Sequence, residues 1–264
     1  MTLSVRTCPT VDEASAALAA GRARYLGGGT LVVRNASEGD LSFDTLVRST
    51  DPALSRIAVA GGEASLGAGV TMAAITRHPG LAAIAKAARA VGGPAIRNMA
   101  TVGGNLFAAA PYGDFAVALM ALGATVEAGG KALGIDDFLQ VRDDIRTMVT
   151  GVRFPLPAAG AFRFVKVSRI KPKGVSVLSI AAVIETDAGG AVCSARVALG
   201  CMADRPIRAR AAEAALVGAT LTEAGVAKAV AAVSEGIRPI TDPIASAWYR
   251  GEVLPVHFRR LLLA

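Results

Sequence analysis

The chain has 264 residues, of which 53% are hydrophobic and 5% aromatic, and it carries a formal net charge of +7 at pH 7. This length suits two or three packed subdomains, and apolar runs such as Phe115–Leu122 stop far short of the ~20 residues that span a bilayer, which excludes a transmembrane segment. Nucleic-acid binding is not expected either, because the basic residues are scattered and few aromatic residues are available for base stacking. The N-terminus, Met1–Arg6, lacks a secretory signal, so we expect a cytoplasmic protein.

The first elements are predicted by a cap and by glycines. Thr10 followed by Glu13 forms a capping box in front of the apolar positions of Val11–Ala20, which predicts a short helix. A strand then leads into the triple glycine Gly27–Gly29, where we expect a tight turn that delivers the next β-branched run to a buried strand or a helix start. A second, half-buried strand is predicted near Ile57–Leu66.

The middle of the chain mixes helices and strands. Helices are predicted over Leu81–Val91 and from Asp114 to Leu122, and strands over Thr125–Glu127 and Met148–Pro155. Pro155 and Pro157 then mark the main boundary of the chain, because proline ends a strand that needs its backbone donors.

Beyond this boundary, alternating apolar and polar residues predict an antiparallel sheet. Its strands are expected at Phe162–Val167, Ser176–Glu185 and Val192–Leu199. Alanine-rich helices should lie behind it at Ala209–Val217 and Glu223–Ser234, followed by a terminal helix. The fold class predicted for the whole chain is therefore α+β.

The most informative stretch for function leads from a glycine pair to a carboxylate. The pair Gly103-Gly104 lets backbone N–H groups approach an anion closely, and the side chains of Thr101 and Asn105 can add hydrogen bonds. Asp114 begins an apolar helix, where its carboxylate can cap backbone N–H groups or accept hydrogen bonds from ribose or ribityl hydroxyls. This pattern predicts a nucleotide site, although neither glycine cluster matches the dinucleotide fingerprint or the P-loop.

Three separated segments carry a resemblance to one family. Gly27-Gly28-Gly29-Thr30 resembles the Ala-Gly-Gly-Thr/Gln turn, and Ile96–Asn105 with Asp114 resembles the second signature, of the FAD-binding medium subunits of molybdenum hydroxylases, the xanthine dehydrogenase and aerobic carbon monoxide dehydrogenase family. Pro239–Arg250 resembles the closing Asp-x-x-x-Ser-x-x-Tyr-Arg pattern of that family. The signatures occur in the family's order, and the resemblance spans nearly the whole chain.

The resemblance implies a division into domains. Residues 1–157 would form a two-subdomain FAD-binding fold of the PCMH/vanillyl-alcohol-oxidase type, with subdomains of about 1–52 and 53–157 that hold FAD between them. Residues 161–264 would form a C-terminal antiparallel sheet with helices, similar to the C-terminal domain of CO dehydrogenase flavoproteins.

The resemblance also implies which residues hold FAD. Backbone amides of the two glycine segments would hold the diphosphate; these residues are Gly27, Gly28, Gly29, Thr30, Leu31, Thr101, Val102, Gly103, Gly104 and Asn105. Asp114 would bind cofactor hydroxyls, and Lys166 matches a basic residue of the strand beside the flavin ring. Val149 or Thr150 would lie near the isoalloxazine ring.

The chain departs from the family pattern at three positions. Leu31 stands where many relatives have Asp or Ser, Ala108 where some have a hydroxyl, and Val175 where an acidic residue is common. The change at Val175 could alter the flavin potential or the access of the electron acceptor. None of the three removes the diphosphate site.

The sequence predicts no catalytic residue and no metal site on this chain. Cys8, Cys193 and Cys201 are too few and too widely spaced for a metal cluster, and no nucleophile–base pair is evident. Any redox chemistry would therefore belong to the flavin, with the protein supplying binding and electrostatics. The resemblance implies an electron-transfer subunit that passes electrons from [2Fe–2S] clusters of a small partner subunit to NAD+, a quinone or oxygen. A large partner subunit would carry the molybdopterin cofactor and hydroxylate the substrate, and two heterotrimers would pair into a dimer.

Two other classes of function stay open at this point. One is a stand-alone flavoprotein oxidoreductase of related fold with its own substrate pocket, against which the missing acid–base residues argue. The other is a non-redox nucleotide-binding module in which the glycine clusters are only turns. Stoichiometric flavin would exclude the second class, and a copurifying molybdenum subunit would exclude the first.

Overall fold

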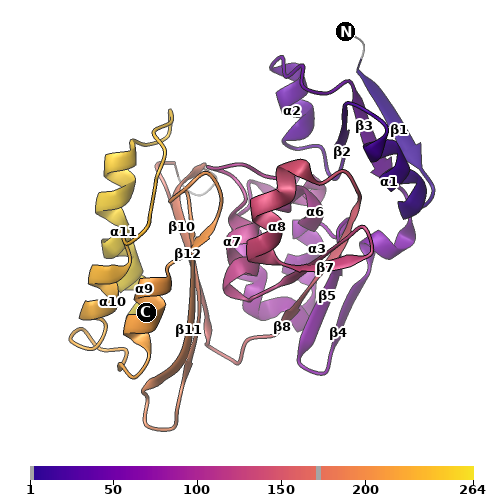
Figure 1. Ribbon diagram of the computed structural model, residues 1–264. Helices are drawn as coiled ribbons and strands as arrows, with labels where there is room; N and C mark the ends of the chain where they lie inside the picture. The colour runs from indigo at the N-terminus through magenta and orange to yellow at the C-terminus, as the bar shows by residue number, and fades with distance from the viewer. Residues whose placement is uncertain (1–2, 171–173) are drawn as a thin grey trace.

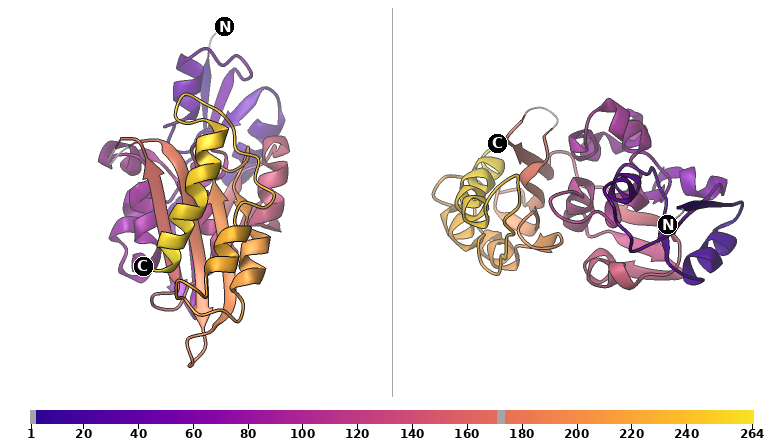
Figure 2. Two further views of the ribbon diagram at one scale, coloured as in Figure 1. Left: turned by 90° about the vertical axis from the view of Figure 1, so that its left-hand side faces the viewer. Right: turned by 90° about the horizontal axis from the view of Figure 1, so that it is seen from above.

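Three sheets with their own helices follow one another along the chain (Figure 1). The computed structural model describes residues 3–170 and 174–264. The two N-terminal units form one side of the molecule, and the C-terminal sheet stands beside them with helix α11 (Ala247–Leu262) on its outer face (Figures 1 and 2). The predicted α+β class is confirmed.

The first unit is a parallel sheet of three short strands. In sheet order these are β1 (Ser4–Cys8), β3 (Thr45–Ser49) and β2 (Ala23–Tyr25). Helix α1 (Val11–Ala19) connects β1 to β2, and the Thr10 hydroxyl accepts a hydrogen bond from the Glu13 amide at 3.2 Å, which confirms the predicted cap of this helix. After the triple glycine the chain enters helix α2 (Val32–Ser37), so of the two continuations predicted there the helix start is the one that forms.

The second unit is built on an antiparallel sheet of five strands. In sheet order these are β4 (Ile57–Ala60), β5 (Glu63–Gly67), β8 (Val149–Pro155), β6 (Thr125–Ala128) and β7 (Lys131–Gly134). The single strand predicted near Ile57–Leu66 is wrong, because Gly61 and Gly62 both have positive φ and turn the chain into a hairpin of β4 and β5.

Short helices and 3-10 turns pack around this sheet. In chain order they are η1 (Pro52–Ser55), α3 (Met72–Arg77), η2 (Pro79–Ile84), α4 (Ala85–Ala90), α5 (Pro94–Met99), α6 (Val102–Leu106), α7 (Asp114–Ala121), α8 (Ile135–Val141) and η3 (Arg142–Asp144). The helix predicted over Leu81–Val91 is thus divided between η2 and α4. All residues of α7 are buried, because this helix lies between the second unit and strands β10 and β11 of the C-terminal sheet.

The third unit is the predicted antiparallel sheet with helices behind it. Its strands in sheet order are β12 (Ile207–Arg208), β11 (Val192–Gly200), β10 (Ser176–Thr186) and β9 (Phe162–Ser168). Helices α9 (Arg210–Leu216), α10 (Ala227–Ala232) and α11 cover one face. Helix α10 begins four residues later than the predicted start at Glu223.

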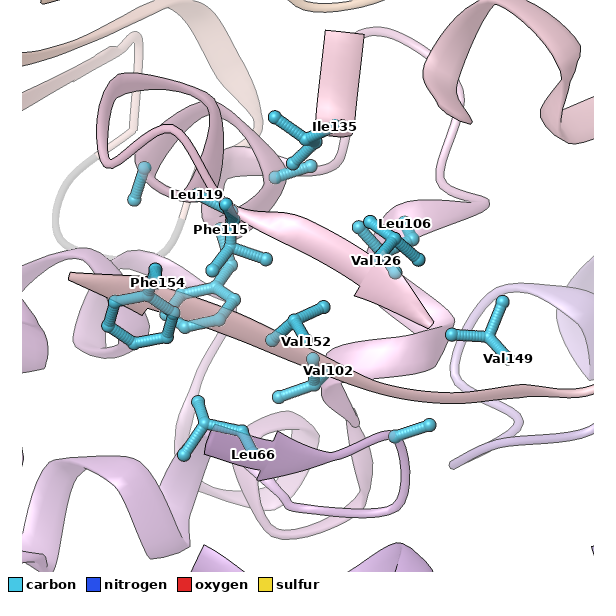
Figure 3. Packing of buried hydrophobic residues seen from close by; sticks show 14 of the residues in the cluster. Leu66, Val102, Leu106, Phe115, Leu119, Val126, Ile135, Val149, Val152 and Phe154 are labelled. Carbon is cyan, nitrogen blue, oxygen red and sulfur yellow. The ribbon is translucent and has the colours of Figure 1, made fainter. Parts of the chain in front are cut away.

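Two hydrophobic cores meet at strand β10. Ala181 and Val183 belong to the core that runs through both N-terminal units, part of which Figure 3 shows around Phe115 and Val152. Ile180 and its neighbours of the same parity belong to a second core under the C-terminal helices. Because both faces of β10 are covered, the C-terminal unit is firmly packed against α7. No helix in the described ranges has both the length and the apolar character needed to cross a membrane.

Candidate functional site

A cavity of about 460 Å³ lies where the three units meet. This volume falls within the range of small-molecule and cofactor sites, which is roughly 300–1,000 Å³. Ten of the residues singled out from the sequence line it: Gly27, Gly28, Gly29, Thr30, Leu31, Thr101, Gly104, Asn105, Asp114 and Lys166. The three positions that depart from the family pattern, Leu31, Ala108 and Val175, line it as well. The fold therefore gathers segments that are more than 130 residues apart in the sequence.

The two glycine segments touch each other at the cavity wall. A Cβ atom on Gly28 would overlap the backbone carbonyl of Met99, and one on Gly27 would meet the Thr101 side chain. Gly29 has a φ of +73°, in the left-handed region. Backbone packing against backbone at Gly28 explains why this position is occupied by glycine.

The first glycine segment offers a row of backbone donors. Among the described residues, no acceptor is found for the backbone N–H groups of Gly27, Gly28, Gly29, Thr30 and Leu31. Leu26, directly before them, donates to the Val47 carbonyl at 2.7 Å, so the row begins where the pairing with β3 ends. Successive N–H groups without a partner at a cavity wall make a site for an anion.

In the second glycine segment, acceptors within the protein engage the backbone N–H groups of Val102–Asn105, whereas none is found among the described residues for the N–H of Thr101. The amide of Val102 donates to Val70, that of Gly103 to Ala68, and those of Gly104 and Asn105 to the hydroxyl and the carbonyl of Thr101, at distances of 2.8 to 3.1 Å. Gly104 and Asn105 bond to Thr101 because this segment forms helix α6 with Thr101 as its N-cap, whereas Val102 and Gly103 bond to the backbone that precedes helix α3. The amides of Val102–Asn105, expected to hold a diphosphate, are therefore not free to do so.

Four further sequence-derived residues lie away from the cavity wall. Val102 and Val149 are buried in the hydrophobic core (Figure 3), and Gly103 packs against Ala68. The Thr150 hydroxyl donates to the Glu127 carbonyl at 3.3 Å. Val149 pairs with Ala128 of β6 at the start of β8, and the chain lines the cavity just before this strand, over residues 145–147.

Asp114 and Lys166 form a buried ion pair between two units. Their charged atoms lie 2.8 Å apart, and Lys166 also donates to the Ala90 carbonyl at 2.9 Å. The other carboxylate oxygen of Asp114 accepts a hydrogen bond from the Ser176 hydroxyl at 2.7 Å. Gly113 is the N-cap residue of α7, so the Asp114 side chain reaches across to the C-terminal unit and does not cap its own helix. Pairing and hydrogen bonding are what allow such charges to be buried.

The structure adds cavity residues that the sequence did not suggest. Burial raises the pKa of Tyr25 to about 12, and a hydrogen bond with Thr101 offsets part of this increase. The buried Arg142 guanidinium donates to the Leu106 and Ala108 carbonyls at 3.3 and 3.0 Å, and desolvation lowers the pKa of Arg142. No pattern in the sequence marks Arg142, whose acceptors lie more than 30 residues away.

Arg34 and Tyr112 meet across the cavity from two different units. The guanidinium of Arg34 donates to the Tyr112 hydroxyl at 2.9 Å and lies 4.9 Å from the centre of its ring. The hydrogen bond to Tyr112 is the main cause of a raised pKa of Arg34.

Positive side chains outnumber negative ones at this cavity. Arg24, Arg34, Arg142, Arg146 and Lys166 line it, against Asp40, Asp114 and Asp143, which gives five positive and three negative charges among the described residues. Together with the free amides of the first glycine segment, this excess favours an anionic ligand.

Comparison with known proteins matches both halves of the chain. The FAD binding domain in molybdopterin dehydrogenase is matched by residues 3–157, and the CO dehydrogenase flavoprotein C-terminal domain by residues 163–264. In sequence, the chain is 28% identical over 176 residues to the glyceraldehyde dehydrogenase medium chain of Sulfolobus acidocaldarius, covering 64% of this chain and 63% of that protein. The match therefore spans just under two thirds of that relative's length.

A second relative and a solved structure are matched more completely. The chain is 29% identical over 216 residues to the nicotinate dehydrogenase FAD-subunit of Eubacterium barkeri, covering 75% of this chain and 72% of that protein. In structure, it is similar to a chain of the carbon monoxide dehydrogenase from Hydrogenophaga pseudoflava, with a TM-score of 0.90, 25% identity, and coverage of 99% of this chain and 96% of that one.

Proposed function

The chain belongs to the family of FAD-binding medium subunits of molybdenum hydroxylases. We propose that it holds FAD in the cavity between its three units. In this proposal it serves as the electron-transfer subunit of such an enzyme. The observation that carries this proposal is the row of unpaired amides at Gly27–Leu31 in a cavity with excess positive charge. When bound, FAD supplies the redox chemistry, and the protein supplies binding and electrostatics.

The first glycine segment would hold the diphosphate of FAD. Its five amides have no acceptor among the described residues, and the backbone contact between Gly28 and Met99 fixes the segment against the second unit. The second segment would contribute the Thr101 and Asn105 side chains and the Thr101 amide at the wall, while the amides of Val102–Asn105 stay bonded within the protein. The family resemblance implies instead that backbone amides of both segments hold the diphosphate.

Other residues of the cavity wall would hold the rest of the cofactor. Lys166 and Asp114 line it as an ion pair, and we propose that they face the ribityl and flavin portions of FAD. Tyr25, Phe107 and Ile96 add apolar surface to the same cavity. Apolar walls with a few fixed polar groups exclude water and orient a bound ring.

The same proposal includes partner chains. Electrons would arrive from the [2Fe–2S] clusters of a small subunit and leave to NAD+, a quinone or oxygen, and a large subunit would carry the molybdopterin cofactor. A dimer of heterotrimers is the assembly we expect. The support for partners is that similar proteins are named as the medium chain of glyceraldehyde dehydrogenase and the FAD-subunit of nicotinate dehydrogenase.

The test is to purify the chain alone and co-expressed with a large molybdenum subunit and a small [2Fe–2S] subunit from the same organism, and to measure the flavin in each preparation. We expect about one FAD per chain, released on denaturation, and flavin that is bleached by a hydroxylase substrate only in the co-expressed complex. Absence of FAD from both preparations would contradict the cofactor proposal. Substrate oxidation by the chain alone would contradict the role as an electron-transfer subunit.

A further inference from the structure

Ser176 lies at the point where the C-terminal unit reaches the cavity. It is the first residue of β10, is 0% exposed and lines the cavity next to Gly174 and Val175. Its hydroxyl donates to one oxygen of Asp114 at 2.7 Å, while Lys166 pairs with the other oxygen at 2.8 Å. Both oxygens of the Asp114 carboxylate are therefore held by residues of the C-terminal unit.

The start of β10 is itself fixed by a buried arginine. Arg250, on helix α11 and 0% exposed, donates to the Val177 carbonyl at 2.6 Å and to the Ser176 carbonyl at 3.5 Å. Its guanidinium also pairs with Asp242 at 2.7 Å. Asp242 and Arg250 belong to the closing pattern of the chain, so this pattern sets the backbone from which the Ser176 hydroxyl is presented.

We propose that Ser176 is a positioning residue of the cofactor site, which fixes the Asp114 carboxylate at the cavity wall and so makes cofactor binding depend on the C-terminal unit. This inference rests on the proposed function, because it takes FAD as the ligand of the cavity. Without the hydroxyl, the carboxylate keeps only Lys166 as a partner and is free to rotate toward it. The ion pair then leaves the geometry in which it faces the cavity.

The chain offers a matched control on the same strand. Ser179 is 1% exposed and lies three residues further along β10, and its hydroxyl has no hydrogen-bond partner among the described residues. Replacing either serine by alanine removes one buried hydroxyl. Only S176A removes a hydrogen bond to a charged group.

The experiment measures the dissociation constant of FAD and the visible circular dichroism of bound flavin for the full chain, S176A, S179A, D114A and the double variant D114A/S176A. We expect S176A to weaken FAD binding about tenfold and to alter the dichroism of the flavin, since hydrogen bonds to charged groups are among the stronger ones. S179A should bind FAD within about twofold of the unsubstituted chain. In the D114A background, S176A should add less than about twofold, because the two groups act as one unit.

Several outcomes would overturn the inference. FAD binding and dichroism unchanged in S176A would show that the hydroxyl is not needed at the site. A full effect of S176A in the D114A background would show that Ser176 does not act through Asp114. A folded S179A beside an S176A that fails to fold would assign Ser176 a purely structural role. If the unsubstituted chain binds no FAD, the proposed function fails first, which keeps the two failures distinguishable.

Discussion

The two glycine segments look alike in sequence but differ in what their backbones do. In Gly27–Leu31, five amides have no acceptor among the described residues, whereas in Val102–Asn105 every amide has one inside the protein. The first segment is an open turn between a strand and a helix, and the second is the first turn of a capped helix. Glycine content alone therefore does not identify a phosphate site; what matters is whether secondary structure has already used the N–H groups.

The strongest test of this comparison is Gly28→Ala. Its Cβ atom would overlap the backbone of Met99, which cannot move as a flexible side chain can. We expect a loss of about 3 kcal/mol or more in the free energy of unfolding, together with loss of FAD binding. Thermal unfolding and FAD titration would measure the two effects.

Gly21→Ala is the matched control for this variant. Gly21 also lies in the first unit, but no heavy atom would come within 4 Å of a Cβ atom added there. It should change stability by no more than about 0.5 kcal/mol. Equal behaviour of the two variants would contradict the close approach of the two glycine segments.

Much of the fold, but less of the site, could be predicted from the sequence. The strands of the C-terminal sheet follow from alternation, and the first helix follows from its Thr10 cap, because these signals are local. The contact between Asp114 and Ser176 joins residues 62 positions apart, and no local pattern contains it. The amides of Val102 and Gly103 donate to the carbonyls of Val70 and Ala68, and the sequence around the glycine pair does not predict this long-range pairing.

Tyr25 lies against Gly27 and Gly103, so its pKa reports on burial where the two glycine segments meet. Burial raises the pKa of its phenol to about 12, above the ordinary value of 10.0, so the folded chain keeps a proton that the unfolded chain releases. The free energy of unfolding should therefore fall as pH rises from about 10 to 12, by about 1 kcal/mol per pH unit from this group once partial exposure is allowed for.

Tyr25→Phe tests this assignment. The variant should lack this part of the pH dependence, measured as the difference in denaturant unfolding between the two proteins at pH 9 and pH 11. Cys201, whose pKa is also raised to about 12 by burial, is present in both proteins and cancels in the difference. Parallel curves for the two proteins would show that the Tyr25 phenol is not desolvated where the segments meet.

Thr101→Ala tests the N-cap of helix α6, which the second glycine segment forms. The Thr101 hydroxyl accepts from the Gly104 amide at 3.1 Å, and loss of an N-cap typically costs about 1 kcal/mol. Ser246→Ala removes an equivalent cap from α11, where the Ser246 hydroxyl accepts from the Tyr249 amide at 3.2 Å. Thr101→Ala should cost more stability in thermal unfolding than Ser246→Ala, because Thr101 is buried and its loss also removes the hydrogen bond to Tyr25. Only Thr101→Ala should change FAD affinity, because Thr101 lines the cavity and Ser246 does not.

Gly104→Ala should have the smallest effect on stability and on FAD affinity. It tests whether a glycine of the second segment is needed for FAD as Gly28 of the first segment is. A Cβ atom on Gly104 would lie 3.2 Å from the Thr101 hydroxyl, and alanine favours a helix over glycine by about 1 kcal/mol, so the two contributions should nearly cancel. Because the Gly104 amide already has its acceptor, FAD affinity should change by less than about threefold, which is under 1 kcal/mol. A loss of FAD binding as complete as that expected for Gly28→Ala would mean that the cofactor needs the bare backbone of both segments, and the asymmetry between them would then lie in their hydrogen bonds alone.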